Sequence, residues 1–114
     1  MYKNILFVED EQFIAEMYAD ILTGEGMKVQ IEGDGKQGYE LAATGNYDLV
    51  LLDLMLPNMT GLEILRRLRD NTISPNFTRN HHVIILTNLD EDDITKKKIF
   101  ELAEGYYMKV EITP

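Results

Sequence analysis

Residues 48–61 read DLVLLDLMLPNMTG, in which an apolar run lies between two aspartates and is followed by a proline and a glycine. Short apolar runs of this kind are typical of strands that are buried on both faces of a parallel sheet. Pro57 marks a loop, because proline donates no backbone hydrogen bond. The stretch therefore predicts a strand from Asp48 to Asp53, a loop through Pro57, and a helix that starts after Gly61.

Four other stretches have the composition of strands. Lys3 to Val8 and Val83 to Thr87 contain apolar runs that suit buried strands. Lys28 to Glu32 and Tyr106 to Lys109 are shorter and weaker candidates. Together with the stretch above, they give five expected strands.

Segments with helical periodicity separate these strands. The clearest helix has apolar residues at i, i+3, i+4, i+7 and i+8, namely Ile14, Met17, Tyr18, Ile21 and Leu22. Gly24 and Gly26 then supply its stop signal. We expect further helices over Lys36 to Ala43 and Asp92 to Ala103.

The helix that starts after Gly61 has leucines on one side and arginines on the other. Its apolar positions are Leu62, Leu65 and Leu68, and its solvent-facing positions are Arg66, Arg67 and Arg69. The segment from Asp70 to His82 is polar, contains Pro75 and is longer than most connections. We therefore expect it to form a surface loop.

The expected order is βαβαβαβαβ. Alternation of apolar strands with helices predicts an α/β domain with a parallel sheet covered on both faces, because right-handed crossovers place helices there. A chain of 114 residues with 45% apolar content is enough for one core. We expect a single domain over residues 1–114.

Composition excludes several classes of function. No apolar run reaches the roughly 18 residues that span a bilayer, and the N-terminus lacks a signal-peptide pattern, so we expect a cytoplasmic protein without membrane contact. A formal net charge of -9 argues against binding of nucleic acid by this domain. Without cysteine, a metal must be held by oxygen atoms or by the two histidines. We assign no function to His81 and His82, because they precede the fourth strand and so lie at its amino end.

Polar residues end four of the five expected strands. In a parallel sheet these ends meet at one edge, which brings together Glu9, Asp10, Asp53, Thr87 and Lys109. Three carboxylates in a partly desolvated pocket repel one another unless a cation is present. Mg2+ prefers oxygen ligands, so we expect direct coordination by Asp10 and Asp53, with Glu9 acting through a water.

The same residues suit phosphoryl transfer. An ionised carboxylate can attack phosphorus without a general base, which makes Asp53 the candidate nucleophile. Lys109 would pair with one phosphoryl oxygen and the Thr87 hydroxyl would donate to another. The plainer alternatives are that Asp10 only caps a helix, that Thr87 is only a strand residue and that Lys109 is only a solvated strand end.

Four segments resemble the receiver domains of two-component response regulators. They read VEDE at 8–11, DLMLPNMTG at 53–61, LT at 86–87 and GYYMK at 105–109. The resemblance implies a flavodoxin-like, doubly wound, five-stranded sheet of order 2-1-3-4-5. It also implies Mg2+-dependent phosphorylation of Asp53 by a histidine kinase or a histidine phosphotransfer protein.

The resemblance assigns further roles. It implies that the Met55 backbone carbonyl binds the metal, and that Thr87 and Tyr106 move together as a switch. Tyr107 should face the opposite side of its strand. Dephosphorylation would be slow and self-catalysed, so we expect no enzyme activity on external substrates. The surface change would serve an unidentified output partner or a phosphorylation-dependent homodimer.

Three features depart from the family pattern. Asn88 stands where a small residue is usual, close to the phosphoryl pocket. Val110 stands where a cis proline is usual; because a non-proline cis bond costs about 3–4 kcal/mol, we expect a trans peptide and a shifted Lys109 loop. The family's fifth helix is absent from residues 1–114, from which we expect a domain truncated before that helix.

Two other functions compete with this interpretation. A phosphatase of the haloacid-dehalogenase type also uses an aspartate nucleophile, but it needs a second aspartate two residues later, where this chain has Met55. A receiver-like binding scaffold without phosphate exchange is the second alternative. Asn88, Val110 and the missing fifth helix leave this alternative open, whereas Asp53, Thr87 and Lys109 argue against it.

Overall fold

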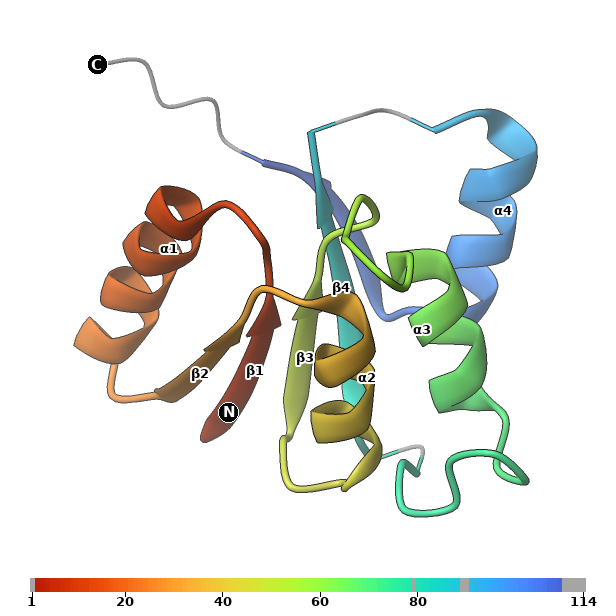
Figure 1. Ribbon diagram of the computed structural model, residues 1–114, viewed down its shortest axis with the longest axis horizontal. Helices are drawn as coiled ribbons and strands as arrows, with labels where there is room; N and C mark the ends of the chain where they lie inside the picture. Colours follow the sequence, from red (N-terminus) through yellow and green to blue (C-terminus); the bar gives the residue numbers. More distant parts are fainter. Residues whose placement is uncertain (1, 79, 89–90, 110–114) are drawn as a thin grey trace.

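The computed structural model describes residues 2–78, 80–88 and 91–109, which form five strands and four helices (Figure 1). The strands are β1 (Asn4–Val8), β2 (Lys28–Glu32), β3 (Leu49–Leu52), β4 (His82–Thr87) and β5 (Gly105–Met108). The helices are α1 (Gln12–Gly24), α2 (Gly35–Ala43), α3 (Gly61–Arg69) and α4 (Asp93–Leu102). The bounds of β2 are the predicted ones, and the other predicted bounds differ by one residue at one or both ends, which is the usual uncertainty there.

The strands form one parallel sheet in the order β2-β1-β3-β4-β5, which confirms the predicted topology. The register pairs Val8 of β1 with Leu52 of β3, and Leu52 with Ile85 of β4. The three central strands therefore end almost level. The residues that follow these three strands therefore lie at the same edge of the sheet.

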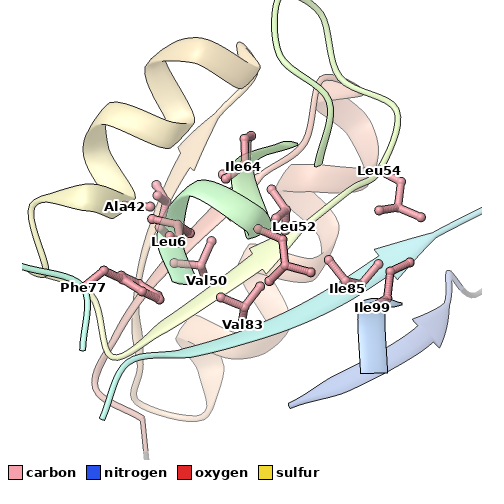
Figure 2. Close-up of a cluster of buried hydrophobic side chains, with 13 residues drawn as sticks. Leu6, Ala42, Val50, Leu52, Leu54, Ile64, Phe77, Val83, Ile85 and Ile99 are labelled. Carbon is pink, nitrogen blue, oxygen red and sulfur yellow. The ribbon is translucent and has the colours of Figure 1, made fainter. Parts of the chain in front are cut away.

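Helices cover both faces of this sheet. Figure 1 shows α1 on one face and α2, α3 and α4 on the other. The larger apolar cluster lies under these three helices, and Figure 2 shows its side chains converging between α2, α3 and the strands: Leu6, Val8, Ala42, Val50, Leu52, Leu54, Ile64, Leu65, Leu68, Phe77, Val83, Ile85 and Ile99. A smaller cluster of Ile5, Phe7, Leu49 and Leu51 faces α1. Alternate residues of β1 and β3 thus serve opposite faces, as the period of two requires.

The apolar face of α1 is centred differently from the predicted stripe. Ala15 and Ala19 are its buried residues, and the Tyr18 ring packs edge-on against Phe7. Ile21, which the periodicity placed in the core, is 58% exposed. Small residues at the contact let α1 lie close to the sheet, so larger side chains beside them remain partly in solvent.

Arg69 does not lie on the solvent-facing side of α3, contrary to the prediction. Its guanidinium donates to the carbonyl oxygens of Leu102 at 2.8 Å and His81 at 3.1 Å, and it forms an ion pair with Glu104 at 2.6 Å. The same Glu104 oxygen accepts from the backbone N–H of Val83 at 2.7 Å. Arg69 therefore joins the ends of α3 and α4 to the start of β4.

The segment between α3 and β4 is packed against the domain, although we predicted a surface loop. Phe77 is 4% exposed and joins the larger apolar cluster, and Ser74 is buried. The Ser74 hydroxyl lies 2.6 Å from the hydroxyl of Tyr39 on α2. Hydrogen bonding thus lets a polar segment cover the end of α2.

Replacing Tyr39 with phenylalanine is expected to lower the free energy of unfolding by about 1–3 kcal/mol, because the buried Ser74 hydroxyl would lose its partner. Urea denaturation measures this change. Tyr107→Phe is the matched control, since that side chain is 60% exposed. Equal stability of the two variants would show that the Tyr39 hydroxyl does not hold the segment.

Candidate functional site

Backbone hydrogen bonds continue the strand ladders beyond the strand ends and so fix the residues that follow. The N–H of Glu9 donates to Glu32 O at 2.9 Å, and that of Asp53 donates to Val8 O at 3.2 Å. The N–H of Lys109 donates to the Thr87 carbonyl at 2.7 Å. Each of these side chains is therefore held by two strands rather than by a free loop.

A cavity of about 290 Å3 lies at this edge of the sheet. Its lining residues come from the end of β4 and from the loops that follow β1, β3 and β4: Asp10, Glu11, Asp53, Met55, Thr87 and Asn88. Asp53 is 5% exposed and Thr87 is fully buried, whereas Asp10 is exposed. The cavity thus has the Asp53 carboxylate at its buried end and the Asp10 carboxylate at its mouth.

Lys109 lies between two acids. Its Nζ is 3.1 Å from Asp53 Oδ2 and also forms an ion pair with Glu9 Oε1. Burial lowers the pKa of Lys109, but the hydrogen bond to Glu9 and the charge of Asp53 outweigh burial, so that the pKa is raised overall. Lys109 therefore carries a positive charge at the point where a phosphoryl group on Asp53 would place negative charge.

The pKa of Glu9 is shifted as well. Burial raises it most, and the neighbouring charge of Asp53 raises it further, while Lys109 and the N–H of Glu11 lower it. The net direction is upward. Independently of this shift, three carboxylates face the single Lys109 ammonium group at this edge, and a further cation would balance them.

The three carboxylates fit a divalent ion. Ligand oxygens of Glu9, Asp10 and Asp53 lie within 4.8 Å of one another. All are hard oxygen donors, which Mg2+ prefers, and the exposed side of Asp10 leaves room for the waters that this ion usually retains. The residues present therefore fit a magnesium ion, with Asp10 and Asp53 on the cavity.

Tyr106 packs beside the β4–α4 connection. Its hydroxyl accepts a 3.1 Å hydrogen bond from the N–H of Glu91, and its ring contacts Phe100 at a centroid distance of 5.8 Å. Tyr107 is 60% exposed, which confirms that the two tyrosines face opposite sides of β5. Tyr106 is thus connected to the segment that follows Thr87.

One expectation and one of the plainer alternatives for the site residues differ from the structure. The side chain of Lys109 contacts Asp53, so it is not shifted away from the pocket; its peptide bond to Val110 lies outside the described residues. Asp10 does not cap α1: among the described residues Glu11 holds the N-cap position, and it makes no side-chain capping bond. The acid at Asp10 therefore has no helix-capping role to explain it.

Asp48, His81 and His82 lie at the opposite edge of the sheet, which was predicted for the two histidines. His82 begins β4 and its Nδ1 lies 2.7 Å from the Tyr2 hydroxyl, while His81 Nε2 contacts Gly45 O at 2.8 Å. Asp48 Oδ2 accepts from the N–H groups of Lys3 and Asn4. These side chains tie loops together and do not reach the acidic pocket.

The pKa of Asp48 lies below its ordinary value of 3.8. The main cause is the hydrogen bond from the backbone N–H of Lys3, followed by that from Asn4. A carboxyl whose pKa is lower in the folded state stabilises the protein above its unfolded pKa. Asp48→Asn is therefore expected to lower the Tm near neutral pH, with the difference from wild type shrinking as the pH falls below 3.8. Thermal unfolding across pH measures this, with the exposed Asp20→Asn as control.

Comparison with known proteins agrees with this geometry. The family model described as the response regulator receiver domain matches residues 5–111, nearly the whole chain. The chain belongs to the response regulator receiver domain family. It is therefore a receiver domain of the two-component type, and its acidic cluster occupies the strand ends that the resemblance indicated.

Curated relatives are longer than this receiver. Response regulator ArlR of Staphylococcus epidermidis is 48% identical over 109 residues, which cover 93% of this chain but 45% of that protein. The uncharacterized transcriptional regulatory protein YkoG of Bacillus subtilis is 53% identical over 66 residues, 58% of this chain and 29% of that protein. The chain thus spans less than half the length of these relatives.

Solved receivers share the fold. The BeF3-activated N-terminal receiver domain of Klebsiella pneumoniae RstA superposes with a TM-score of 0.80 at 31% identity, covering 96% of this chain and 88% of that one. The receiver domain of the Francisella response regulator 1452 gives a TM-score of 0.79 at 28% identity, with 94% and 84% covered. Within the described residues of this receiver, no helix is long and apolar enough to cross a membrane.

Two residues of this receiver, in loops at the same edge of the sheet as the cavity, were not predicted from the sequence. Asp34, the N-cap of α2, and Asn58, in the β3–α3 loop, are joined by a side-chain hydrogen bond. Asn58 has φ +70°, a left-handed conformation that asparagine tolerates better than most residues. An asparagine directly after Pro57 was the available signal, but it did not indicate the partner.

Proposed function

We propose that this receiver accepts a phosphoryl group on Asp53 in a Mg2+-dependent reaction and changes its surface in response. The observation that carries the proposal is the contact of the buried Lys109 ammonium with Asp53 Oδ2 at 3.1 Å, beside a cavity that also holds Asp10. A buried lysine whose charge is held by two acids is suited to neutralise an anion that forms between them.

In the proposed reaction a carboxylate oxygen of Asp53 attacks phosphorus. The bond from phosphorus to the donor breaks as the new O–P bond forms, and the donor nitrogen or oxygen leaves with the electron pair. An ionised carboxylate needs no general base. Lys109 stabilises the negative charge of one phosphoryl oxygen, and the Thr87 hydroxyl donates to another. Asp10, Asp53 and the Met55 carbonyl would hold a Mg2+, with Glu9 acting through water, and the ion would supply further charge neutralisation.

The response would pass through Thr87 and Tyr106. Thr87 lines the cavity, and the Tyr106 hydroxyl is bonded to the N–H of Glu91 in the segment that follows β4. Movement of Thr87 toward a phosphoryl group would change the space beside that tyrosine. The surface of α4 and β5 is then the part of the receiver that reports phosphorylation.

The proposed phosphoryl donor is a histidine kinase or a histidine phosphotransfer protein in the cytoplasm. The proposed reader is an output domain or protein, and a phosphorylation-dependent homodimer is one form it can take. The proposal includes self-catalysed acceptance and slow dephosphorylation, without turnover of external substrates. It assigns no nucleic-acid contact to residues 1–114, whose net charge of -9 opposes one.

The test is incubation with acetyl phosphate and Mg2+, followed by intact mass and by amide NMR shifts with beryllofluoride. Wild type is expected to gain one labile phosphoryl mass and to show Mg2+-dependent shifts near Thr87 and Tyr106. Asp53→Asn should lose both, whereas Asp48→Asn, at the other end of β3, should keep them. A folded wild type that binds Mg2+ without either change would favour the binding-scaffold alternative.

A further inference from the structure

The loop between β3 and α3 contacts the turn between β2 and α2 at the same edge of the sheet (Figure 1). The Asn58 side chain donates to Asp34 Oδ1, and the Gly35 N–H donates to the Pro57 carbonyl at 2.9 Å. We call these four residues, Asp34, Gly35, Pro57 and Asn58, the loop clasp. It joins segments that lie far apart in the sequence.

The loop clasp is specific in its geometry. The two carboxylate oxygens of Asp34 have different partners. Oδ2 accepts from the N–H of Gln37 at 2.9 Å and so caps α2, while Oδ1 accepts from the side-chain amide of Asn58. A Cβ on Gly35 would lie 2.8 Å from the Pro57 carbonyl oxygen, too close for any other residue. Asn58 itself needs a left-handed backbone, with φ +70°. The two segments are thus joined by a side-chain hydrogen bond and a backbone hydrogen bond, and the left-handed backbone of Asn58 accompanies them.

Pro57 of the loop clasp comes two residues after Met55, which belongs to the metal-binding part of the proposed site. Met55 lines the cavity with Asp10 and Asp53, and its N–H lies 3.4 Å from Asp53 Oδ1. Met55 is 63% exposed, so its own side chain does little to anchor it. Its backbone is therefore held by its neighbours, which are the buried Leu54, whose carbonyl accepts from the Gly61 N–H at 3.0 Å, and the loop clasp on the other side.

We propose that the loop clasp holds the β3–α3 loop so that the Met55 carbonyl is in place for Mg2+, which makes Asn58 and Asp34 positioning residues for metal binding. The inference rests on the proposed function. Mg2+ requires a nearly ideal octahedron, so a small displacement of one ligand weakens its binding. Outer partners that orient ligands commonly change metal affinity by about 10- to 100-fold.

The central variant is Asn58→Asp, which keeps the size of the side chain and its tolerance of a left-handed backbone but places a carboxylate against that of Asp34. We expect its Mg2+ Kd to rise by about 10-fold, from titrations followed by amide NMR shifts. A variant carrying both Asp34→Asn and Asn58→Asp reverses donor and acceptor. Because asparagine also caps helices well, this double variant should recover the wild-type Kd.

Two further measurements separate positioning from stability. Urea denaturation in EDTA reports the stability of each variant without metal, and Asn58→Gly removes the side-chain contact without backbone strain. The proposal expects Asn58→Gly to weaken Mg2+ binding too, whereas a merely structural contact would lower stability and leave the Kd unchanged. A Kd close to wild type in both single variants, or a wild type that binds no Mg2+, overturns the inference. If the Kd values change as expected while wild type forms no phosphoryl adduct, the proposed function fails and the loop clasp stands.

Discussion

Lys109→Ala is expected to lower the free energy of unfolding in EDTA by about 3–5 kcal/mol, because it leaves two buried acids without their counter-charge. Glu9 is 1% exposed and Asp53 is 5% exposed, and both contact the Lys109 ammonium. Urea denaturation measures the loss. Mg2+ should restore part of the stability of the variant, since it binds the same carboxylates in the folded protein only.

The pH dependence of this variant gives a second check. The pKa of Glu9 is already raised, mainly by burial, and removal of Lys109 raises it further. A carboxyl with a raised folded pKa costs stability as the pH rises above its unfolded pKa, so the deficit should shrink as the pH falls toward 4.5. Lys97→Ala, on the exposed side of α4, is the control. If both variants lose equally little, Lys109 is not the compensating charge.

Gly61→Ala is expected to destabilise the protein by about 3 kcal/mol and to abolish phosphoryl acceptance. A Cβ at this position would lie 2.8 Å from Leu54 Cα and 2.9 Å from the carbonyl carbon of Asp53, and nearer still to the Asp53 oxygen. The atoms in the way are backbone, which cannot rotate aside. The segment that carries Asp53 would have to move.

Gly24→Ala is the matched control for this steric effect. Gly24 is the last residue of α1, and a Cβ there would meet no atom within 4 Å. Alanine is the better helix former, so the control should equal wild type in stability or exceed it by up to about 1 kcal/mol. Phosphoryl acceptance should be unchanged. A Gly61→Ala variant that still forms the adduct would mean that Asp53 tolerates displacement of its backbone.

The strands and their edge could be predicted because the responsible signals are local. An apolar run such as 49–52 indicates a buried strand by itself. Parallel pairing of the strands then brings Asp53 and Lys109 to the same edge of the sheet. The position of Lys109 was judged wrongly from Val110. The Lys109 N–H donates to the Thr87 carbonyl on the neighbouring strand. This hydrogen bond fixes the backbone of Lys109 and does not depend on the residue at position 110.

The contacts that could not be predicted involve pairs far apart in the sequence. Ser74 and Arg69 are polar residues in or beside a polar segment, so the sequence indicates exposure. Hydrogen bonds to partners on α2 and α4 compensate the cost of burying them. Periodicity likewise could not show that α1 approaches the sheet through Ala15 and leaves Ile21 outside, since both lie near its apolar side. Asn58 and Asp34 belong to this class as well.

The central place of β1 in the sheet has a consequence for folding during synthesis. β1 pairs with β2, which follows soon after it, and on its other side with β3, where Ile5 meets Leu49. A nascent chain that has emerged only through Glu32 can form β1, α1 and β2, but one edge of β1 is then open and apolar. Open edges of this kind recruit strands from other chains. Slow translation of residues 33–48 would therefore prolong the exposure of this edge and promote aggregation before the domain closes.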